Sequence, residues 1–234
     1  MPNNIKITNL KPAIAIPLTY QHVPTPFFDN FILLHKPEDC IYLRATNGPI
    51  DDLRNDLVNH ALKINCSHII MMDTDMLYHP KTIVKLLTYD LPVVGALCYR
   101  RYPPFDPLMF RGEVNHYRTI MDWKEGDLVE VDATGTGCIV FHMDVFRNMP
   151  PPWFKFRQNE EEEGIIGEDI GFCSDLRKAG YKIYVDTSVP SSHLTTLEVN
   201  HQTWLLYRAV KSEYNKKITS ETSEIFEKKL EEVI

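Results

Sequence analysis

The stretch that decides the fold is SHIIMMDTDM, residues 67–76. An apolar run in this stretch ends abruptly in Asp73 and Asp75, and a run of this length is typical of a buried strand. Side chains alternate along a strand, so the two carboxylates would point the same way at its carboxyl end. They repel each other unless a cation sits between them, and oxygen ligands of this kind suit Mg²⁺ or Mn²⁺. The alternative is a solvated turn, because Asp is common in turns.

Strands and helices alternate on both sides of this stretch. Strands are expected over 13–17, 40–45 and 92–98, and helices over 51–65 and 80–89. This order predicts an α/β fold with a parallel sheet, in which ligands bind beyond the carboxyl ends of the strands. Asp73 and Asp75 lie at such an end, as do the residues that follow the first strand, Pro17, Leu18 and Thr19.

The second half of the chain is less regular. A hairpin is expected over 113–131, turning at 124–127, and a strand over 129–141 that is interrupted by the segment Thr134–Gly137. Glycines in a strand indicate either a bulge or close approach of the backbone to a ligand. A helix is expected to begin at Gly167-Glu168-Asp169 and to run through Lys178, followed by a strand over 181–185. Ser191 to His193 would then lie in a loop.

Composition limits the classes of protein that the chain can belong to. Its 234 residues suffice for one large domain with an appendage, and a helical extension over 197–234 is expected to pack on a domain formed by 1–196. The net charge of −7 disfavours a protein that grips nucleic acid by its phosphates. No apolar run approaches the roughly 18 residues of a membrane span, and the N-terminus lacks the pattern of a signal peptide. Five scattered cysteines without a zinc pattern indicate a reducing cytoplasm.

Several of these motifs, in this order, resemble those of GT-A-fold glycosyltransferases. The resemblance covers roughly residues 11–195 and is closest to the family-2-like group, especially its small phage and microbial members. It implies a GT-A (nucleotide-diphospho-sugar transferase, Rossmann-like) fold with a mixed, mostly parallel central sheet. The motifs that carry it are the strand Ala13–Leu18, Leu53-Arg54-Asn55, the DxD motif Asp73-Thr74-Asp75, Thr134-Gly135-Thr136-Gly137-Cys138, Gly167-Glu168-Asp169 and His193.

The resemblance also implies a nucleotide-sugar site. The donor would be a UDP- or GDP-sugar, and a divalent ion, Mn²⁺ or Mg²⁺, would neutralise its diphosphate. The expected metal ligands are Asp73, Asp75 and His193, the last of which favours Mn²⁺. Two of the expected residues have ordinary alternatives, since His193 could be a loop histidine and Arg54 a surface arginine of a helix. The residues expected to contact the nucleotide or the sugar are Pro17, Leu18, Thr19, Arg54, Asp73, Thr74, Gly135, Thr136 and Gly137.

The pair Glu168 and Asp169 is the candidate for proton transfer. Asp169 would accept the proton of the acceptor hydroxyl, and Glu168 would orient the acceptor or its loop. In-line attack would then invert the anomeric configuration, although retaining enzymes share this fold. The alternative is that the two acids only favour the amino end of a helix.

Two other functions remain open. A sugar nucleotidyltransferase shares the sheet architecture, but such enzymes carry a Gly-rich basic loop after the first strand, where this chain reads PLTYQH, residues 17–22. A non-catalytic module that binds nucleotide sugars or carbohydrates is the other alternative. The acceptor is open among protein, glycan, lipid-linked sugar, small molecule and modified DNA.

Overall fold

The computed structural model describes residues 10–159 and 164–212. The chain divides into two compact units, Met1–Thr195 and Thr196–Ile234. In the second unit, residues 201–212 are helical, and the Asn200 side chain accepts hydrogen bonds from the backbone of Gln202 and Thr203, as a helix N-cap does. Packing of the extension on the first unit stays a prediction, and its last part, 213–234, lies outside the described residues.

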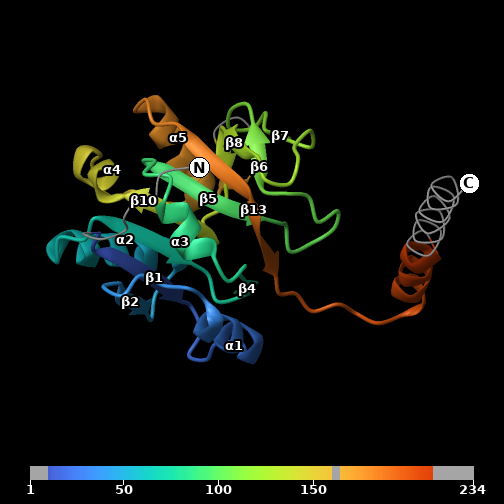
Figure 1. Ribbon diagram of the computed structural model, residues 1–234. Coiled ribbons are helices and arrows are strands. Elements are labelled where there is room, and N and C mark those ends of the chain that lie inside the picture. The colour runs from blue at the N-terminus through green and yellow to red at the C-terminus, as the bar shows by residue number, and fades with distance from the viewer. Residues whose placement is uncertain (1–9, 160–163, 213–234) are drawn as a thin grey trace, which may run out of the picture. The chain divides into compact units, whose positions relative to one another are not determined.

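The first unit is built on an eight-stranded sheet (Figure 1). Its order is β2-β1-β3-β10-β5-β13-β4, with β8 paired to β13. β1, β2, β3, β5 and β13 run in one direction, and β10, β4 and β8 run in the other. This confirms the expected α/β fold with a mixed, mostly parallel sheet. The strands are β1 (Pro12–Leu18), β2 (Ile41–Thr46), β3 (His68–Met72), β4 (Met76–Leu77), β5 (Val93–Cys98), β8 (Leu128–Val131), β10 (Cys138–His142) and β13 (Ile183–His193).

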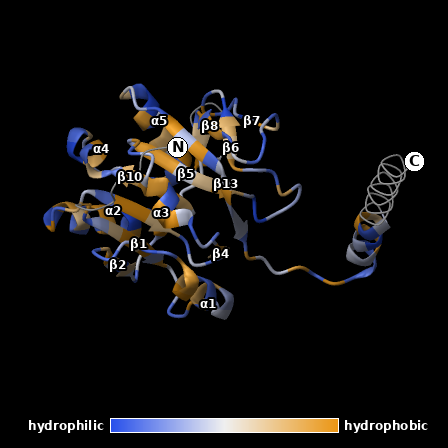
Figure 2. Cartoon of the chain, in the orientation of Figure 1, coloured by the Kyte–Doolittle hydropathy of each residue, from blue (hydrophilic) through white to orange (hydrophobic). Residues whose placement is uncertain are grey.

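Helices cover both faces of the sheet, which explains why its central strands are apolar throughout (Figure 2). Ile69 and Met71 of β3 belong to a core shared with α2, α4 and α5. Ile70 and Met72 belong to the opposite core, shared with α1 and α3. The helices are α1 (Thr25–Leu33), α2 (Ile50–Lys63), α3 (Thr82–Leu87), α4 (Met143–Asn148) and α5 (Glu168–Lys178). Among them α1 and α4 were not expected from the sequence. No helix of the described residues is long and apolar enough to cross a membrane.

Two expectations for the second half were wrong. The expected hairpin over 113–131 does form its turn, where Asp127 N donates to Lys124 O, but its strands pair elsewhere. β8 joins the central sheet beside β13, and β7 (Arg118–Thr119) pairs with β6 (Met109–Arg111), which also pairs with β9 (Ala133–Thr134). The last strand does not end at 185, because β13 runs to His193 and shifts register between Asp186 and Ser191.

Candidate active site

The backbone at the end of β3 is fixed by buried hydrogen bonds. Asp73 N donates to Gly137 O at 3.0 Å, and the Tyr78 hydroxyl lies 2.5 Å from Asp73 O and 2.9 Å from Gly137 O. Tyr78 is only 3% exposed. A Cβ added at Gly137 would lie 3.7 Å from Asp73 Oδ2, so the glycine segment passes directly beside the first aspartate of the DxD motif.

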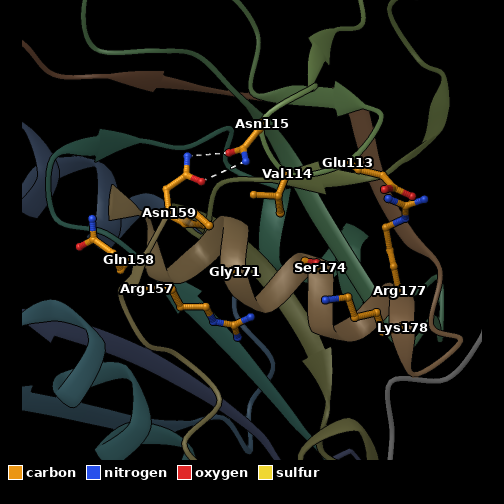
Figure 3. Close-up of a pocket in the computed structure, with 11 residues that line it drawn as sticks. Glu113, Val114, Asn115, Arg157, Gln158, Asn159, Gly171, Ser174, Arg177 and Lys178 are labelled. Carbon is orange, nitrogen blue, oxygen red and sulfur yellow. Dashed lines mark hydrogen bonds between the residues drawn. The ribbon is translucent and has the colours of Figure 1, made fainter. Parts of the chain in front are cut away.

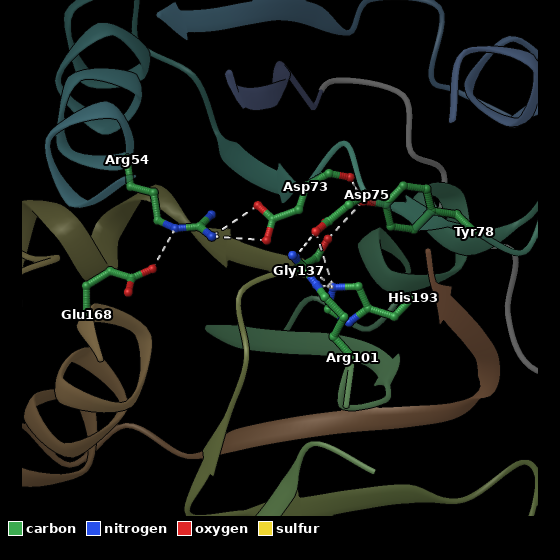
Figure 4. A network of polar contacts seen from close by, with 8 residues as sticks. All are labelled: Arg54, Asp73, Asp75, Tyr78, Arg101, Gly137, Glu168 and His193. Carbon is green, nitrogen blue, oxygen red and sulfur yellow. Dashed lines mark hydrogen bonds and ion pairs between the residues drawn. The ribbon is translucent and has the colours of Figure 1, made fainter. Parts of the chain in front are cut away.

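Arg54 joins the DxD motif to the start of α5 (Figure 4). Its Nη2 lies 3.0 and 3.1 Å from the two carboxylate oxygens of Asp73, and its Nε donates to Glu168 Oε1 at 3.1 Å. Burial by itself lowers the pKa of Arg54, but the charges of Asp73 and Glu168 outweigh it and hold the pKa above its usual value. Arg54 is 3% exposed, so the alternative of a surface arginine is wrong.

Asp169 follows Glu168 in the first turn of α5. Its Oδ1 accepts a hydrogen bond from Ile170 N at 2.7 Å. Its pKa is raised from 3.8 to about 6, mainly by burial and also by the neighbouring charge of Glu168, against the opposing effects of the Ile170 hydrogen bond and of Arg54. A carboxyl with this pKa is ionised near neutral pH and still a better base than an ordinary aspartate. The backbone of Gly135 lies close by, since a Cβ there would be 3.7 Å from Asp169 Oδ2.

Asp75 faces His193 rather than Asp73. The end of β13 pairs with β4 so that His193 lies opposite Met76, and His193 Nε2 lies 3.4 Å from Asp75 Oδ2. The other ring nitrogen, Nδ1, lies 2.9 Å from Tyr99 O. A carbonyl oxygen only accepts, so Nδ1 carries a hydrogen, and in the neutral form of the ring the lone pair of Nε2 faces Asp75.

This pair fits part of a divalent metal site. A backbone carbonyl behind the imidazole is the arrangement that orients metal-binding histidines, and carboxylate with imidazole suits Mn²⁺. Asp73 is held by Arg54 instead, and among the described residues no group of three His, Cys, Asp or Glu side chains is placed to hold a metal. Asp75 and His193 could therefore supply two ligands to a divalent ion, whose other ligands would be water or phosphate oxygens.

The remaining expected residues lie at the same edge of the sheet but make fewer contacts. Ala15 of β1 pairs with Met71 of β3, so Pro17 lies level with Asp73 at the carboxyl end of the two strands. Leu18 and Thr19 follow Pro17 toward solvent, and Thr74 lies half-buried between the two aspartates. Thr136 is 3% exposed, and its hydroxyl finds no partner among the residues that the structure describes.

Arg101, a residue that the sequence analysis missed, contacts both members of the Asp75–His193 pair. Its Nη2 forms an ion pair with Asp75 Oδ2 and lies 3.3 Å from His193 Nε2 (Figure 4). The sequence does carry a signal for it, because Arg100 and Arg101 follow β5, whose carboxyl end lies at the same edge as that of β3.

A separate pocket of about 660 Å³ lies along α5, next to β11 (Arg157–Gln158) and β12 (Ile165–Ile166) (Figure 3). Two of the charged side chains that line it form ion pairs, Arg157 with Asp175 and Arg177 with Asp132. None of the expected site residues lines it. The cluster around Asp73, Asp75 and Asp169 is therefore the better candidate for chemistry.

Comparison with known proteins bears on the fold. No family model and no curated protein matches the sequence. Among solved structures, A197 from STIV is similar with a TM-score of 0.57 and 17% identity, covering 81% of this chain and 87% of that one. A structure of GalNAc-T7 with UDP, GalNAc and Mn²⁺ is similar with a TM-score of 0.51 and 12% identity over 81% of this chain, which spans only 44% of that protein.

These similarities, together with the sheet topology, show that the chain has the GT-A fold of glycosyltransferases. At 12 to 17% identity they show the fold alone, and the chemistry has to be argued from the site.

Proposed function

We propose that the protein is a metal-dependent glycosyltransferase that moves a sugar from a UDP- or GDP-sugar to an acceptor hydroxyl. The observation that carries this proposal is that a candidate metal-binding pair and a candidate base lie at the same edge of the sheet. The Asp75–His193 pair offers ligands for a divalent ion, and Arg54 connects Asp73 to the helix start that holds Asp169. The fold shared with a protein crystallised with UDP and Mn²⁺ supports the proposal.

Asp75 and His193 would hold the ion, Mn²⁺ or Mg²⁺. Such an ion supplies positive charge that stabilises the departing diphosphate. Asp73 stays bound to Arg54 and faces the ribose, which is the role that the resemblance implies for the first aspartate of this motif. The nucleotide and the sugar would contact the other expected residues, namely Pro17, Leu18, Thr19, Arg54, Thr74, Gly135, Thr136 and Gly137.

Asp169 is the base in this proposal, and Glu168 is a positioning residue. Arg54 binds Glu168, and burial is the main cause that raises the pKa of Asp169 to about 6. The acceptor oxygen forms a bond to the anomeric carbon while the bond from that carbon to the phosphate oxygen breaks. The acceptor proton passes to the Asp169 carboxylate, and the bonding electrons leave with the diphosphate. Attack opposite to the leaving group inverts the configuration.

The first experiment is a thermal-shift panel of UDP, GDP and their sugars with and without Mn²⁺. We expect a stabilisation that is selective for one nucleotide and needs the metal. The donor selected in this way is then tested for sugar release to water and transfer to acceptors. Asp75→Asn should abolish turnover and leave the fold intact, whereas Asp122→Asn, at an exposed position, should behave as the wild type.

Three results would contradict the proposal. Full turnover by Asp75→Asn would remove the metal site from the mechanism. Release of pyrophosphate from a nucleoside triphosphate and a sugar phosphate would instead indicate a sugar nucleotidyltransferase. Nucleotide-sugar binding without turnover, across many acceptors and in water, would indicate a binding module.

A further inference from the structure

Arg101 occupies the position that a cation bound by Asp75 and His193 would take. Its guanidinium forms an ion pair with Asp75 Oδ2, and its Nε and Nη2 lie 3.4 and 3.3 Å from His193 Nε2. Both acceptors therefore point at one positive group, as Figure 4 shows. A carboxylate oxygen and an imidazole lone pair 3.4 Å apart repel each other, so this arrangement needs a positive group or a hydrogen-bond donor between them.

The two arginines of the site differ in how firmly they are held. The side chain of Arg54 is 4% exposed and binds two carboxylates that are themselves partly or fully buried. The side chain of Arg101 is 42% exposed and pairs with a carboxylate that is 30% exposed. Exposed ion pairs contribute only about 0–1 kcal/mol, so a divalent ion can displace Arg101 from Asp75 with little loss.

The charges of the cluster indicate what Arg101 would bind after the ion displaces it. With Arg101 in place, the charge of Asp75 is balanced by the guanidinium. Replacement of the guanidinium by a divalent ion leaves one excess positive charge at the pair and frees the charge of Arg101 beside it. Together they match the diphosphate of a nucleotide sugar, which carries one negative charge on each phosphate, and a guanidinium binds phosphate through paired hydrogen bonds.

We propose that Arg101 is an internal counter-cation that competes with the divalent ion for Asp75 and His193, and that it moves to the diphosphate of the donor when the ion binds. The competition between Arg101 and the ion concerns the metal alone, whereas the movement of Arg101 to the diphosphate rests on the proposed function. Arg101 is thus a specificity-determining residue of the site: it disfavours metal binding without nucleotide and favours binding of the two together.

The test measures the affinity for Mn²⁺ alone of the wild type, Arg101→Ala and Arg100→Ala. The electron paramagnetic resonance signal of the free ion reports how much Mn²⁺ each protein binds. Without nucleotide, we expect Arg101→Ala to bind Mn²⁺ about 2- to 5-fold more tightly than the wild type, because it lacks the competing cation. Arg100, whose guanidinium lies over the Phe110 ring, is the matched control and should change nothing. Asp75→Asn in the Arg101→Ala background should remove the gained affinity.

A second measurement adds UDP at saturating Mn²⁺. Here Arg101→Ala should bind UDP about 10-fold more weakly, the size of one charge-assisted contact, and Arg101→Lys should recover part of the loss. Unchanged or weaker Mn²⁺ binding by Arg101→Ala, or no Mn²⁺ binding by wild type and variant alike, would overturn the inference. Tighter Mn²⁺ binding by this variant in a protein that turns over no nucleotide sugar would keep the inference and contradict the proposed function instead.

Discussion

Arg54 binds both carboxylate oxygens of Asp73 at 3.0 and 3.1 Å, although the two residues come from a helix and from the end of a neighbouring strand. The same guanidinium also binds Glu168, which is 114 residues away in the sequence. One buried positive charge therefore holds two acidic motifs together. The arrangement of the candidate site depends on this contact.

Arg54→Met should destabilise the protein strongly, because it leaves the Asp73 and Glu168 carboxylates without their common partner. Removal of one member of a buried charge cluster typically costs about 3–5 kcal/mol. Urea unfolding at pH 7 measures the loss, and Arg44→Met, at an exposed position of β2, is the control. A loss no larger than that of the control would show that Arg54 does not hold the site.

The sequence predicted the motifs that contain Asp73 and Glu168, but not the contacts that join them. The apolar run before Asp73 requires helices on both faces of β3, and the alternation of Ile69 and Ile70 between two cores fulfils that expectation. Which strand lies next to β3 is not a local property. β10 enters antiparallel between β3 and β5, and this long-range pairing brings Gly137 to Asp73.

The place of His193 illustrates the same limit. The sequence analysis ended the last strand at residue 185 and expected Ser191 to His193 to lie in a loop. In the structure β13 continues through a register shift, and its last residues pair with β4 just after the DxD motif. That pairing, rather than any spacing in the sequence, sets the distance between His193 and Asp75.

The pH dependence of activity should follow Asp169. A base must be deprotonated, and the pKa of Asp169 is raised to about 6, mainly by burial. Turnover at saturating donor and metal should therefore fall as the pH drops through about 6. A pH–rate profile measures this, and a plateau that extends down to pH 4.5 would show that Asp169 is not the base.

Asp169→Asn should lower activity and raise stability at the same time. The folded protein keeps the Asp169 proton up to about pH 6, whereas the unfolded chain releases it near 3.8, so this carboxyl contributes less stability as the pH rises through that window. The amide removes the buried charge while it can still accept the hydrogen bond from Ile170 N. We expect a gain of roughly 1–3 kcal/mol at pH 7 that vanishes near pH 4, and a loss of turnover of about 100-fold or more. Urea unfolding at both pH values should show no such change for Asp122→Asn.

Gly112 and Gly126 both have a left-handed backbone, but only at Gly112 would an added Cβ clash with a neighbouring atom. Alanine at the two positions therefore distinguishes the stability cost of backbone strain from that of a steric clash. Gly112 has φ +119°, and a Cβ there would lie 2.7 Å from His116 O, whereas Gly126 has φ +96° and open space around it. Gly126→Ala should lower the free energy of unfolding by about 1 kcal/mol, because an alanine is strained in the left-handed backbone region. Gly112→Ala should cost at least about twice as much, because the backbone oxygen cannot move away without disturbing the β6–β7 hairpin. Equal losses in chemical denaturation would contradict this difference.

Tyr78→Phe tests whether the turn that carries the DxD motif must be rigid. The hydroxyl of this buried residue lies within hydrogen-bond distance of both Asp73 O and Gly137 O, and its loss leaves those carbonyls less well satisfied. We expect a loss of about 1–2 kcal/mol in unfolding free energy, together with weaker Mn²⁺ binding, because Asp75 follows the loosened backbone by two residues. Tyr89→Phe is the matched control, since its hydroxyl donates to Asp186 Oδ2 at 2.9 Å outside the DxD cluster. It should lower stability by a similar amount and leave Mn²⁺ affinity unchanged, so equal effects of both variants on Mn²⁺ binding would show that the Tyr78 hydroxyl supports only the fold.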